Sequence, residues 1–246
     1  MIFKSIKGFF TEKYFEDKIN YFDSFKLVRY YFPRDNPKVG FFQTMYHTVI
    51  SDLSKSEQDI LQNFKKSTRY KIGRAIRENI VCSEEKNINV FFAFYNDFAQ
   101  SKKIELLRYS TLLKYKNNMI ITKAVYNNTI LVMHVYIYDK EVAMLLYTAS
   151  HFRNVEGSKE KNFISSANLL LHYEDMILLK KMGCKLYDFG GYAFKTKNKS
   201  LQGINNFKDM FNPEHKEEAI YTSLLLFVFL LVKKTASFMG LKMMKL

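Results

Sequence analysis

Two carboxylates stand in sequence contexts that favour acid–base chemistry. Glu174 interrupts the apolar stripe of a helix expected from about Ser165 to Met182, so it must be paired or face a pocket, because an unpaired buried charge is costly. Asp188 ends a predicted strand just before Gly190-Gly191, a position where α/β folds place ligand groups. Either carboxylate could receive the proton of an attacking amine. The alternatives are a buried ion pair with a lysine for Glu174 and a turn-capping role for Asp188.

Lys208 is the third candidate, within the sequence FKDMF. A helix that ends near Phe211 buries Phe207 and Phe211, which lie one turn apart. Lys208 then stands at the flank of the buried face, where a long side chain can curve over an adjoining cleft. We expect Lys208, Asp188 and Glu174 to converge on one pocket. The alternative is a surface lysine on a helix that its two phenylalanines hold in place.

A basic segment lies on the helix expected between Ser54 and Asn79. Lys66, Arg69 and Arg77 can share one side of that helix, with Arg74 and Lys71 more lateral. These cations could bind oxyanions, because a guanidinium group binds phosphate through two N–H groups at once. The alternative is a solvated helix face. The candidate substrate-binding residues are Lys66, Arg69, Arg74, Arg77 and, in the loop after the predicted strand, Tyr192.

The composition favours an anionic partner. Lys and Arg number 38 against 24 Asp and Glu, and the net charge of +14 suits phosphates, RNA or an anionic membrane surface. With 48% hydrophobic residues and few Gly and Pro, the 246-residue chain is too apolar for disorder. Cys82 and Cys184 are expected to be reduced thiols. No metal is expected, since the histidines lack metal-ligand spacing, and no P-loop, GxGxxG or Ser/His/Asp order is present.

The order of expected elements predicts an α/β fold with a mixed, mostly antiparallel sheet flanked by helices. Three strands, Met119–Tyr126, Thr129–Tyr138 and Glu141–Ser150, have two-residue connections that indicate antiparallel hairpins. A helix, a strand, a helix, a strand near Ala219 and a last helix follow, which is the order of a GNAT-like (Gcn5-related) acyltransferase fold. Residues 1–45 are expected to form an N-terminal helix and strands that pack on a main domain of residues 46–246.

Three stretches resemble the FemAB/FemX-like branch of the GNAT acyl-CoA N-acyltransferase superfamily. They are TVISDLSKSEQDILQNFKKSTRYKIGRAIRENI (48–80), LLLHYEDMILLKKMGCKLYDFGG (169–191) and GINNFKDMF (203–211), within a pattern that covers about residues 48–224. The resemblance implies an acyltransferase or aminoacyltransferase, from a branch that includes enzymes of peptidoglycan cross-bridges and GNAT-like proteins of polysaccharide loci. It also implies that Lys208 stabilises negative charge on the donor carbonyl or leaving group.

The resemblance leaves the donor open. Members that use acetyl-CoA carry a Q/R-x-x-G-x-G/A loop at the start of the helix after the meander, where backbone amides hold a pyrophosphate. The matching stretch here, HFRNVEGSKEKNFISSANLL, has one glycine and no such spacing. FemX-like enzymes use aminoacyl-tRNA but carry two such domains, whereas one complete domain is expected here. Acyl-CoA, acyl-carrier protein and aminoacyl-tRNA therefore all stay candidate donors, and no cofactor is assigned.

The leading hypothesis is an enzyme that acylates an amino group of an activated sugar or cell-envelope (peptidoglycan or polysaccharide) precursor by direct attack on the donor carbonyl. Lys208 would stabilise the oxyanion, Glu174 or Asp188 would take the proton, and the basic helix would hold the phosphates of a tRNA or of a phosphorylated sugar or lipid-linked acceptor. A cytoplasmic location is expected, with peripheral contact at the inner face of the membrane through the ends Met1–Phe15 and Leu225–Leu246. The alternative is a non-catalytic membrane-surface binding or scaffold module with a degenerate transferase fold. An RNA-binding protein ranks last, because it rests on charge alone.

Overall fold

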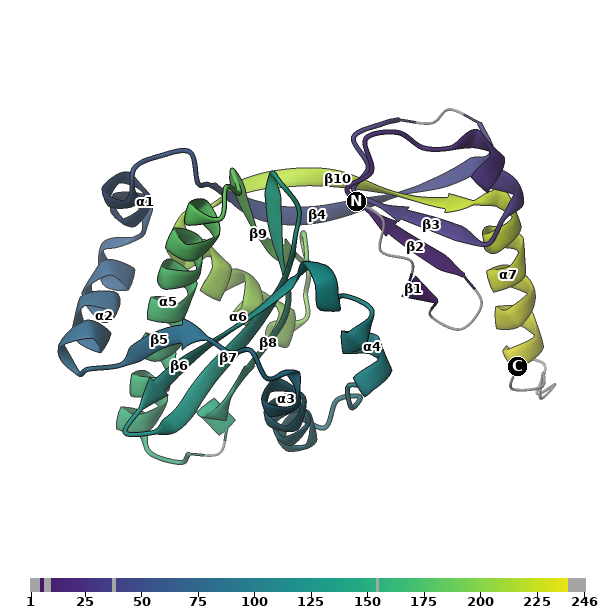
Figure 1. Ribbon diagram of the computed structural model, residues 1–246. Helices are drawn as coiled ribbons and strands as arrows, with labels where there is room; N and C mark the ends of the chain where they lie inside the picture. Colours follow the sequence, from purple (N-terminus) through teal and green to yellow (C-terminus); the bar gives the residue numbers. More distant parts are fainter. Residues whose placement is uncertain (1–4, 7–9, 37–38, 154, 239–246) are drawn as a thin grey trace. The chain divides into compact units, whose positions relative to one another are not determined.

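The computed structural model describes residues 5–6, 10–36, 39–153 and 155–238. By its contacts the chain forms two compact units (Figure 1). Residues 47–216 form the larger unit, and residues 1–46 together with 217–246 form the smaller one. Residues 46–246 are expected from the sequence to form one domain, whereas the contacts group 217–246 with the N-terminal residues.

The larger unit is built on a sheet with the strand order β4-β9-β8-β7-β6-β5. Its strands are β4 (Phe41–Asp52, whose first residues belong to the smaller unit), β5 (Val81–Glu84), β6 (Met119–Tyr126), β7 (Thr129–Tyr138), β8 (Val142–Ser150) and β9 (Leu186–Gly191). Neighbours from β5 to β8 pair antiparallel, and β9 pairs parallel with β8 and antiparallel with β4. Asn127 and Asn128 both have left-handed backbone conformations, which suit the tight turn between β6 and β7. The antiparallel meander and the mixed sheet expected from the sequence are confirmed.

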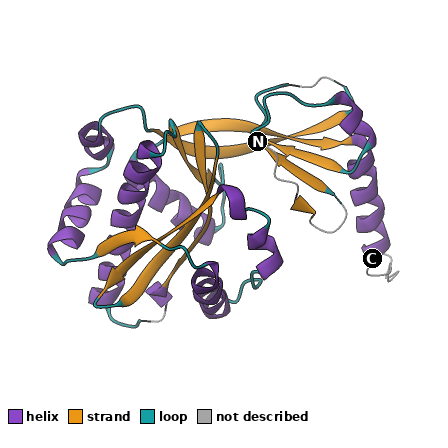
Figure 2. Cartoon of the chain, viewed as in Figure 1, coloured by secondary structure: helices purple, strands orange, loops and turns teal. Residues whose placement is uncertain are grey.

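Helices cover both faces of this sheet (Figure 2). The helices of this unit are α1 (Glu57–Asn63), α2 (Lys66–Arg77), α3 (Ile88–Lys102), α4 (Tyr109–Leu113), α5 (Ser158–Lys181) and α6 (Lys199–Lys208). Ile120 and Ala124 of β6 face a core shared with α1, α2 and α5. Ile121, which points the other way, faces a second core shared with α3 and α4. The alternating side chains of the strands therefore supply both cores.

The single helix expected over residues 54–79 is wrong, because two helices, α1 and α2, occupy this segment. Phe64 between them has an extended backbone, with ψ of 151°, and its side chain is 1% exposed. Its ring meets those of Tyr173 and Phe211 edge-on. Burying this ring outweighs continuing the helix. The N-cap of α1 is Ser56, whose hydroxyl accepts from the amide of Asp59, so the cap lies two residues beyond the expected one.

The expected start of α5 is also wrong. The helix begins at Ser158, within the segment expected to be a polar loop. It carries Glu160 in its first turn, where a negative charge interacts favourably with the positive end of the helix dipole. The expected end is confirmed: Gly183 follows the helix with φ of +96°, the left-handed conformation of a helix-terminating glycine.

The smaller unit contains β1 (Ser5–Ile6), β2 (Thr11–Tyr14), β3 (Val28–Tyr31), β10 (Glu214–Ser223, which enters it at Glu217) and α7 (Leu224–Phe238), with strand order β1-β2-β3-β10. The helix expected within residues 1–20 is wrong, because the described part of this segment contains two strands. β2 pairs parallel with β3, and the rings of Tyr14 and Tyr31 stack with centroids 4.5 Å apart. Within the described residues, no helix combines the length and apolar character needed to cross a bilayer.

Candidate active site

A pocket of about 580 Å³ opens where β8 and β9 part. The two strands pair only along Val142–Met144 and Leu186–Asp188, after which β8 follows β7 and β9 follows β4. The lining comes mainly from β8, β9, α5 and α6. It consists of Phe98, Lys102, Leu145, Thr148, Ala149, Ser150, Phe152, Asn168, His172, Phe189, Lys199, Ser200, Gly203, Ile204, Phe207 and Lys208. The split exposes the end of β9 to a space that is large enough for part of a substrate.

Asp188 holds together the turn at the end of β9. Its Oδ1 accepts hydrogen bonds from the Gly190 amide, at 2.7 Å, and from the Thr48 hydroxyl. Gly190 has φ of +73°, and a Cβ there would lie 3.1 Å from the carbonyl oxygen of Leu145, so the turn requires glycine. The structure thus gives Asp188 the turn-capping geometry, and its part in proton transfer stays a prediction.

Lys208 lies beside this turn and is 7% exposed. Its Nζ donates to the carbonyl of Gly190, at 2.9 Å, and to that of Gly191, at 2.7 Å. Burial lowers the pKa of the ammonium group to about 8, although the charge of Asp188 opposes the shift. An ammonium group has three N–H donors, so one is left for the pocket that Lys208 lines.

Sequence reasoning missed His172, a residue of α5 that lines the same pocket as Lys208. The ring is 1% exposed and packs among three phenylalanines, Phe189, Phe207 and Phe211. Burial holds the pKa of this imidazole well below its ordinary 6.5, and the charges of His134 and Lys208 act in the same direction. Helical spacing was the available signal, since Asn168, His172 and Asp175 share one face of α5.

A buried row of polar side chains begins at this face of α5. His134, inside β7, is fully buried between two α5 residues. Its Nδ1 lies 2.8 Å from Asp175 Oδ2, and its Nε2 lies 2.8 Å from Asn168 Oδ1. Each ring nitrogen therefore lies within hydrogen-bond distance of an oxygen atom.

The row continues from Asp175 back to His172. The Tyr136 hydroxyl donates to Asp175 Oδ2 at 2.6 Å and lies 2.7 Å from the Tyr187 hydroxyl. The Tyr187 hydroxyl lies 2.5 Å from His172 Nδ1. Burial, reinforced by the charge of Asp175, raises the pKa of both phenols well above 10, so both keep their protons. The row ends at the ring that lines the 580 Å³ pocket.

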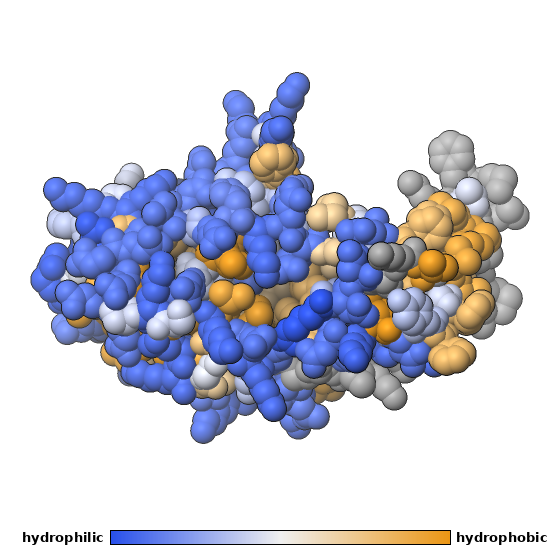
Figure 3. Space-filling view, turned by 90° about the horizontal axis from the view of Figure 1, so that it is seen from above, coloured by the Kyte–Doolittle hydropathy of each residue, from blue (hydrophilic) through white to orange (hydrophobic). Residues whose placement is uncertain are grey.

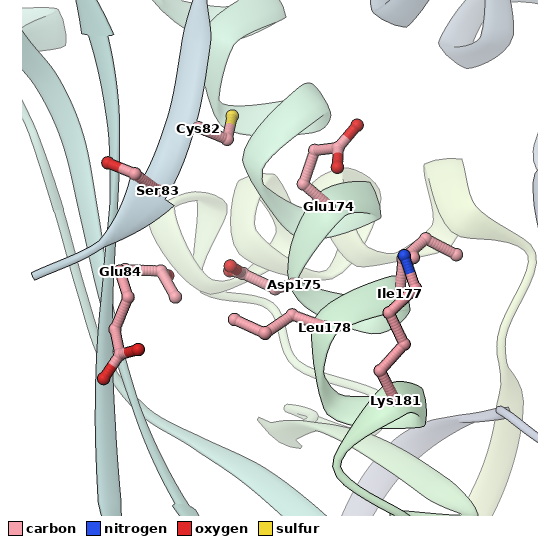
Figure 4. Close-up of a pocket in the computed structure, with 9 residues that line it drawn as sticks. Cys82, Ser83, Glu84, Glu174, Asp175, Ile177, Leu178 and Lys181 are labelled. Atoms are coloured by element: carbon pink, nitrogen blue, oxygen red, sulfur yellow. The ribbon is translucent and has the colours of Figure 1, made fainter.

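Glu174 lines a second, smaller pocket of about 230 Å³, beside the labelled residues Cys82, Asp175 and Lys181 (Figure 4). Burial raises the pKa of its carboxyl group, and the charge of Lys181 opposes this shift. Glu174 is not part of the lining of the larger pocket. Asp188 lies beside Lys208 at the Gly190–Gly191 turn, but it is not part of that lining either. Of the three residues only Lys208 lines the larger pocket, so the expected convergence of all three on one pocket is wrong.

The four basic candidates on α2 differ in their surroundings. Arg69 donates through Nη1 to two carbonyls at the end of α1, one of them at 2.9 Å. Arg74 forms a 2.8 Å ion pair with Glu78, the C-cap residue of the same helix. Lys66 and Arg77 are exposed. None of these four residues lines the 580 Å³ pocket, so their proposed binding of phosphate concerns the outer surface of α2.

Tyr192 follows the end of β9 and lies on yet another pocket, of about 500 Å³, with Asn205 and His215. Its hydroxyl donates to Asp209 Oδ2 at 3.1 Å, and its ring meets that of His215 edge-on. Its role in substrate binding stays a prediction.

No family model matches the sequence, and no curated protein matches it significantly. Solved structures do match the fold. A crystal structure of FemX is similar with a TM-score of 0.63 and 11% sequence identity, over 93% of this chain and 85% of that one. The C-terminal domain of a putative lysylphosphatidylglycerol synthetase from Agrobacterium fabrum has a TM-score of 0.55 and 12% identity, over 80% of this chain and 68% of that one. L-PGS from Bacillus licheniformis has a TM-score of 0.52 and 12% identity, over 82% and 69%.

The chain has a GNAT-like fold of the FemX type. The fold implied by the resemblance in the sequence is thereby confirmed. At these levels of identity the similarity concerns the fold, so the chemistry has to be argued from the residues at the split between β8 and β9.

Proposed function

We propose that this protein is an acyltransferase or aminoacyltransferase that acylates an amine of an activated-sugar or cell-envelope precursor at the split between β8 and β9. The observation that carries the proposal is Lys208, a buried cation with two of its three N–H groups held by the carbonyls of β9. A buried, preorganised donor stabilises a developing oxyanion more strongly than an exposed lysine does. The remaining N–H is available to a donor carbonyl in the 580 Å³ pocket.

The similar structures support this class of reaction. One is FemX, and another comes from a protein named for the synthesis of lysylphosphatidylglycerol, in which lysine is joined to a phospholipid. An aminoacyl group and a cell-envelope acceptor are therefore the substrates that we favour. Exposed Lys66 and Arg77, with Arg69 and Arg74 beside them, stay the proposed contacts for the phosphates of a tRNA or a phosphorylated acceptor.

The start of α5 favours a donor other than CoA. A Cβ built on Gly157, the N-cap of α5, would lie 1.7 Å from Glu160 Oε2. The carboxylate of Glu160 thus already lies against the helix N-terminus, where a pyrophosphate would otherwise bind. The two negative charges would repel each other, which supports an aminoacyl-tRNA or an acyl carrier as the donor.

The reaction that fits this site is a direct displacement. The acceptor amine attacks the donor carbonyl, the C–N bond forms, and the carbonyl oxygen gains negative charge beside Lys208. Collapse of the adduct breaks the bond to the leaving oxygen or sulfur, which takes up the proton that the amine nitrogen loses. Because the pKa of Lys208 is about 8, the ammonium form predominates at neutral pH, so the charge is present when it is needed.

The test is a transfer assay with three donor classes: unfractionated aminoacyl-tRNA, acyl-carrier protein and acetyl-CoA. Acceptors are uridine-diphosphate-linked glucosamine and phosphatidylglycerol vesicles, and mass spectrometry detects the acylated product. We expect turnover with a donor that lacks CoA, and a loss of two to three orders of magnitude in the Lys208→Met variant, as for one oxyanion donor. The matched control is Lys140→Met, at an exposed lysine of the turn between β7 and β8. Absence of turnover with every donor, or equal turnover in both variants, would overturn the proposal.

A second candidate function, contact with a membrane surface, rests on the smaller unit. α7 exposes five apolar side chains to solvent, each 47–53% exposed: Leu224, Leu225, Val228, Leu231 and Val232. Their spacing places them along one stripe of the helix. Phe22 and Phe25 of the same unit are 76% and 78% exposed. Apolar atoms gather in the region of α7 at the right of Figure 3. Together with the net charge of +14, this surface supports peripheral binding to anionic lipid.

Flotation with phosphatidylglycerol-containing vesicles tests this contact. The full chain should float, and the variant Leu225→Ser, Val228→Ser and Leu231→Ser should remain in the dense fraction. A matched variant with Ile76→Ser, which changes an exposed apolar residue of α2, should float like the wild type. Equal flotation of the α7 variant and the wild type would contradict the role of α7. If flotation is retained in a chain without transfer activity, the non-catalytic membrane module becomes the better reading.

A further inference from the structure

We propose that His172 is the general base of this site: its Nε2 takes the proton of the attacking amine, while Asp175 acts through Tyr136 and Tyr187 as a positioning residue. The inference rests on the proposed acyl transfer and adds to it the proton acceptor, for which the sequence favoured Glu174 or Asp188. Among the described residues, the ring of His172 makes its hydrogen bond through Nδ1, to Tyr187. The nitrogen left for the pocket is Nε2.

The directions of the hydrogen bonds between Asp175 and His172 follow from the contact of Tyr136 with the carboxylate. The Tyr136 hydroxyl donates its single proton to Asp175 Oδ2. The oxygen of Tyr136 must then accept from Tyr187 across their 2.7 Å contact. Because the Tyr187 hydroxyl donates its single proton to Tyr136, its oxygen must accept a hydrogen bond from His172 Nδ1. The neutral ring of His172 therefore carries its proton on Nδ1 and keeps a lone pair on Nε2.

The surroundings keep this ring neutral and ready to accept a proton. Three phenylalanines enclose it, and burial together with the charge of Lys208 disfavours its charged form at rest. Neutral imidazole is a weak base here, but the amine nitrogen becomes strongly acidic once it has attacked the carbonyl carbon. Proton transfer to Nε2 is then favourable, and the charge formed on the ring exists only during the reaction.

Lys208 and His172 line the same pocket from different helices, and they supply the two functions that the reaction needs. The amine nitrogen forms the new C–N bond, and its proton moves to Nε2 of His172. The carbonyl oxygen takes the electron pair and is stabilised by the N–H of Lys208. When the adduct collapses, the carbonyl re-forms, the bond to the leaving oxygen breaks, and that oxygen receives the proton from Nε2. The ring is thereby returned to its starting tautomer.

The titratable groups packed around His172 come from four elements. They are His134 and Tyr136 on β7, Asp175 on α5, Tyr187 on β9 and Lys208 on α6. Since both phenols stay protonated, and Lys208 loses its charge only near pH 8, the acid limb of a pH–rate profile is the limb assigned to His172.

The first experiment separates a base from a structural hydrogen-bond donor, in the assay with aminoacyl-tRNA and uridine-diphosphate-linked glucosamine. The amide of His172→Asn can still donate to Tyr187, but it has no basic nitrogen. We expect kcat to fall 10²–10⁴-fold, with KM changed less than threefold and the acid limb of the profile lost. If wild type turns over and His172→Asn retains more than a third of kcat, His172 is not the base. If wild type turns over no donor, the proposed function fails and this inference falls with it.

The second experiment tests the positioning row with a matched pair of variants. Tyr136→Phe and Tyr30→Phe each remove a buried hydroxyl that donates to an aspartate at 2.6 Å, Asp175 in the first case and Asp23 in the second. Only Tyr136→Phe interrupts the row, so it should lower kcat at least tenfold while Tyr30→Phe leaves kcat unchanged. Equal effects in the two variants would overturn the positioning role.

A third readout does not depend on activity, and it serves even if His172→Asn fails to fold. Nitrogen-15 NMR of histidine-labelled wild type should show His172 as the neutral tautomer protonated on Nδ1. Asp175→Asn, which can donate to Tyr136 and so reverse the row, should convert this signal to the tautomer protonated on Nε2. A wild-type ring protonated on Nε2 would contradict the proposal, because no lone pair would then face the pocket.

Discussion

The buried ammonium group of Lys208 predicts a specific dependence of stability on pH. Burial lowers the pKa of this group from its ordinary value of 10.5 to about 8 in the folded chain. The unfolded chain therefore binds more protons than the folded chain between these two values, so the free energy of unfolding rises with pH across this interval. Below pH 8 the full cost of the buried charge is present, and above 10.5 it is gone. The difference in pKa corresponds to about 3 kcal/mol.

Lys208→Met removes this contribution. Urea unfolding of wild type and variant, followed by circular dichroism at pH 7, 8, 9 and 10, gives two curves of the free energy of unfolding against pH. Subtracting the variant curve from the wild-type curve cancels the other titrating groups. The difference should rise by about 2–3 kcal/mol from pH 7 to 10, almost all of it above pH 8. The loss of the hydrogen bonds to Gly190 and Gly191 lowers the free energy of unfolding of the variant by a constant amount. It therefore leaves the slope of the difference curve against pH unchanged.

The control for this experiment is Lys140→Met, because Lys140 is exposed. Its difference curve should be flat within about 0.5 kcal/mol, as for an ordinary surface substitution. A flat curve for Lys208→Met as well would show that this ammonium group is not desolvated in the folded chain. The reasoning from Lys208 to a preorganised oxyanion donor would then fail.

Three further predictions concern the same site. Gly190→Ala should lower the free energy of unfolding by about 1–3 kcal/mol, because Gly190 has a positive φ and a Cβ there would meet the Leu145 carbonyl. Gly203→Ala, at an open position of α6, should instead raise the free energy of unfolding by about 0.5–1 kcal/mol. Urea unfolding measures both changes. Thr48→Val removes the hydroxyl that donates a hydrogen bond to Asp188 and should lower the free energy of unfolding by about 1–3 kcal/mol by the same method. A loss below about 0.5 kcal/mol would show that this bond contributes little to stability. In steady-state kinetics, kcat/KM should fall as pH rises through about 8, because Lys208 loses its proton there, and a profile that stays flat to pH 10 would exclude the ammonium form as the active one.

Much of the fold could be predicted from local sequence patterns. The β6–β7–β8 meander is confirmed because its strands are strongly apolar and its turns are short, and both signals are local. The break between α1 and α2 could not be predicted in this way, because Phe64 leaves the helix to pack on Phe211, a residue 147 positions away. The N-terminal strands were missed for a similar reason, since β2 is fixed by pairing with β3 rather than by its own periodicity.

The site was predictable only where a motif marked it. Lys208 does lie beside the turn at Asp188, as expected. This part was predictable because the sequence around Lys208 indicated a helix, and the sequence around Asp188 indicated a strand followed by a glycine pair. The prediction for Glu174 was wrong by one residue of the helix. Its neighbour Asp175 joins the buried row, whereas Glu174 lines the smaller pocket. His172 was overlooked because its partners, Tyr136 and Tyr187, come from two other strands, and only the folded sheet brings them to α5.

The central claim is that Lys208 stabilises a tetrahedral oxyanion at the split between β8 and β9. Its most direct test is calorimetric binding of a tetrahedral analogue, a phosphonate ester of adenosine with an aminoacyl side chain, compared with its planar ester. Wild type should bind the phosphonate 10²–10³-fold more tightly than Lys208→Met does, while the two proteins bind the planar ester equally. Equal affinity of wild type and Lys208→Met for the phosphonate would contradict the account.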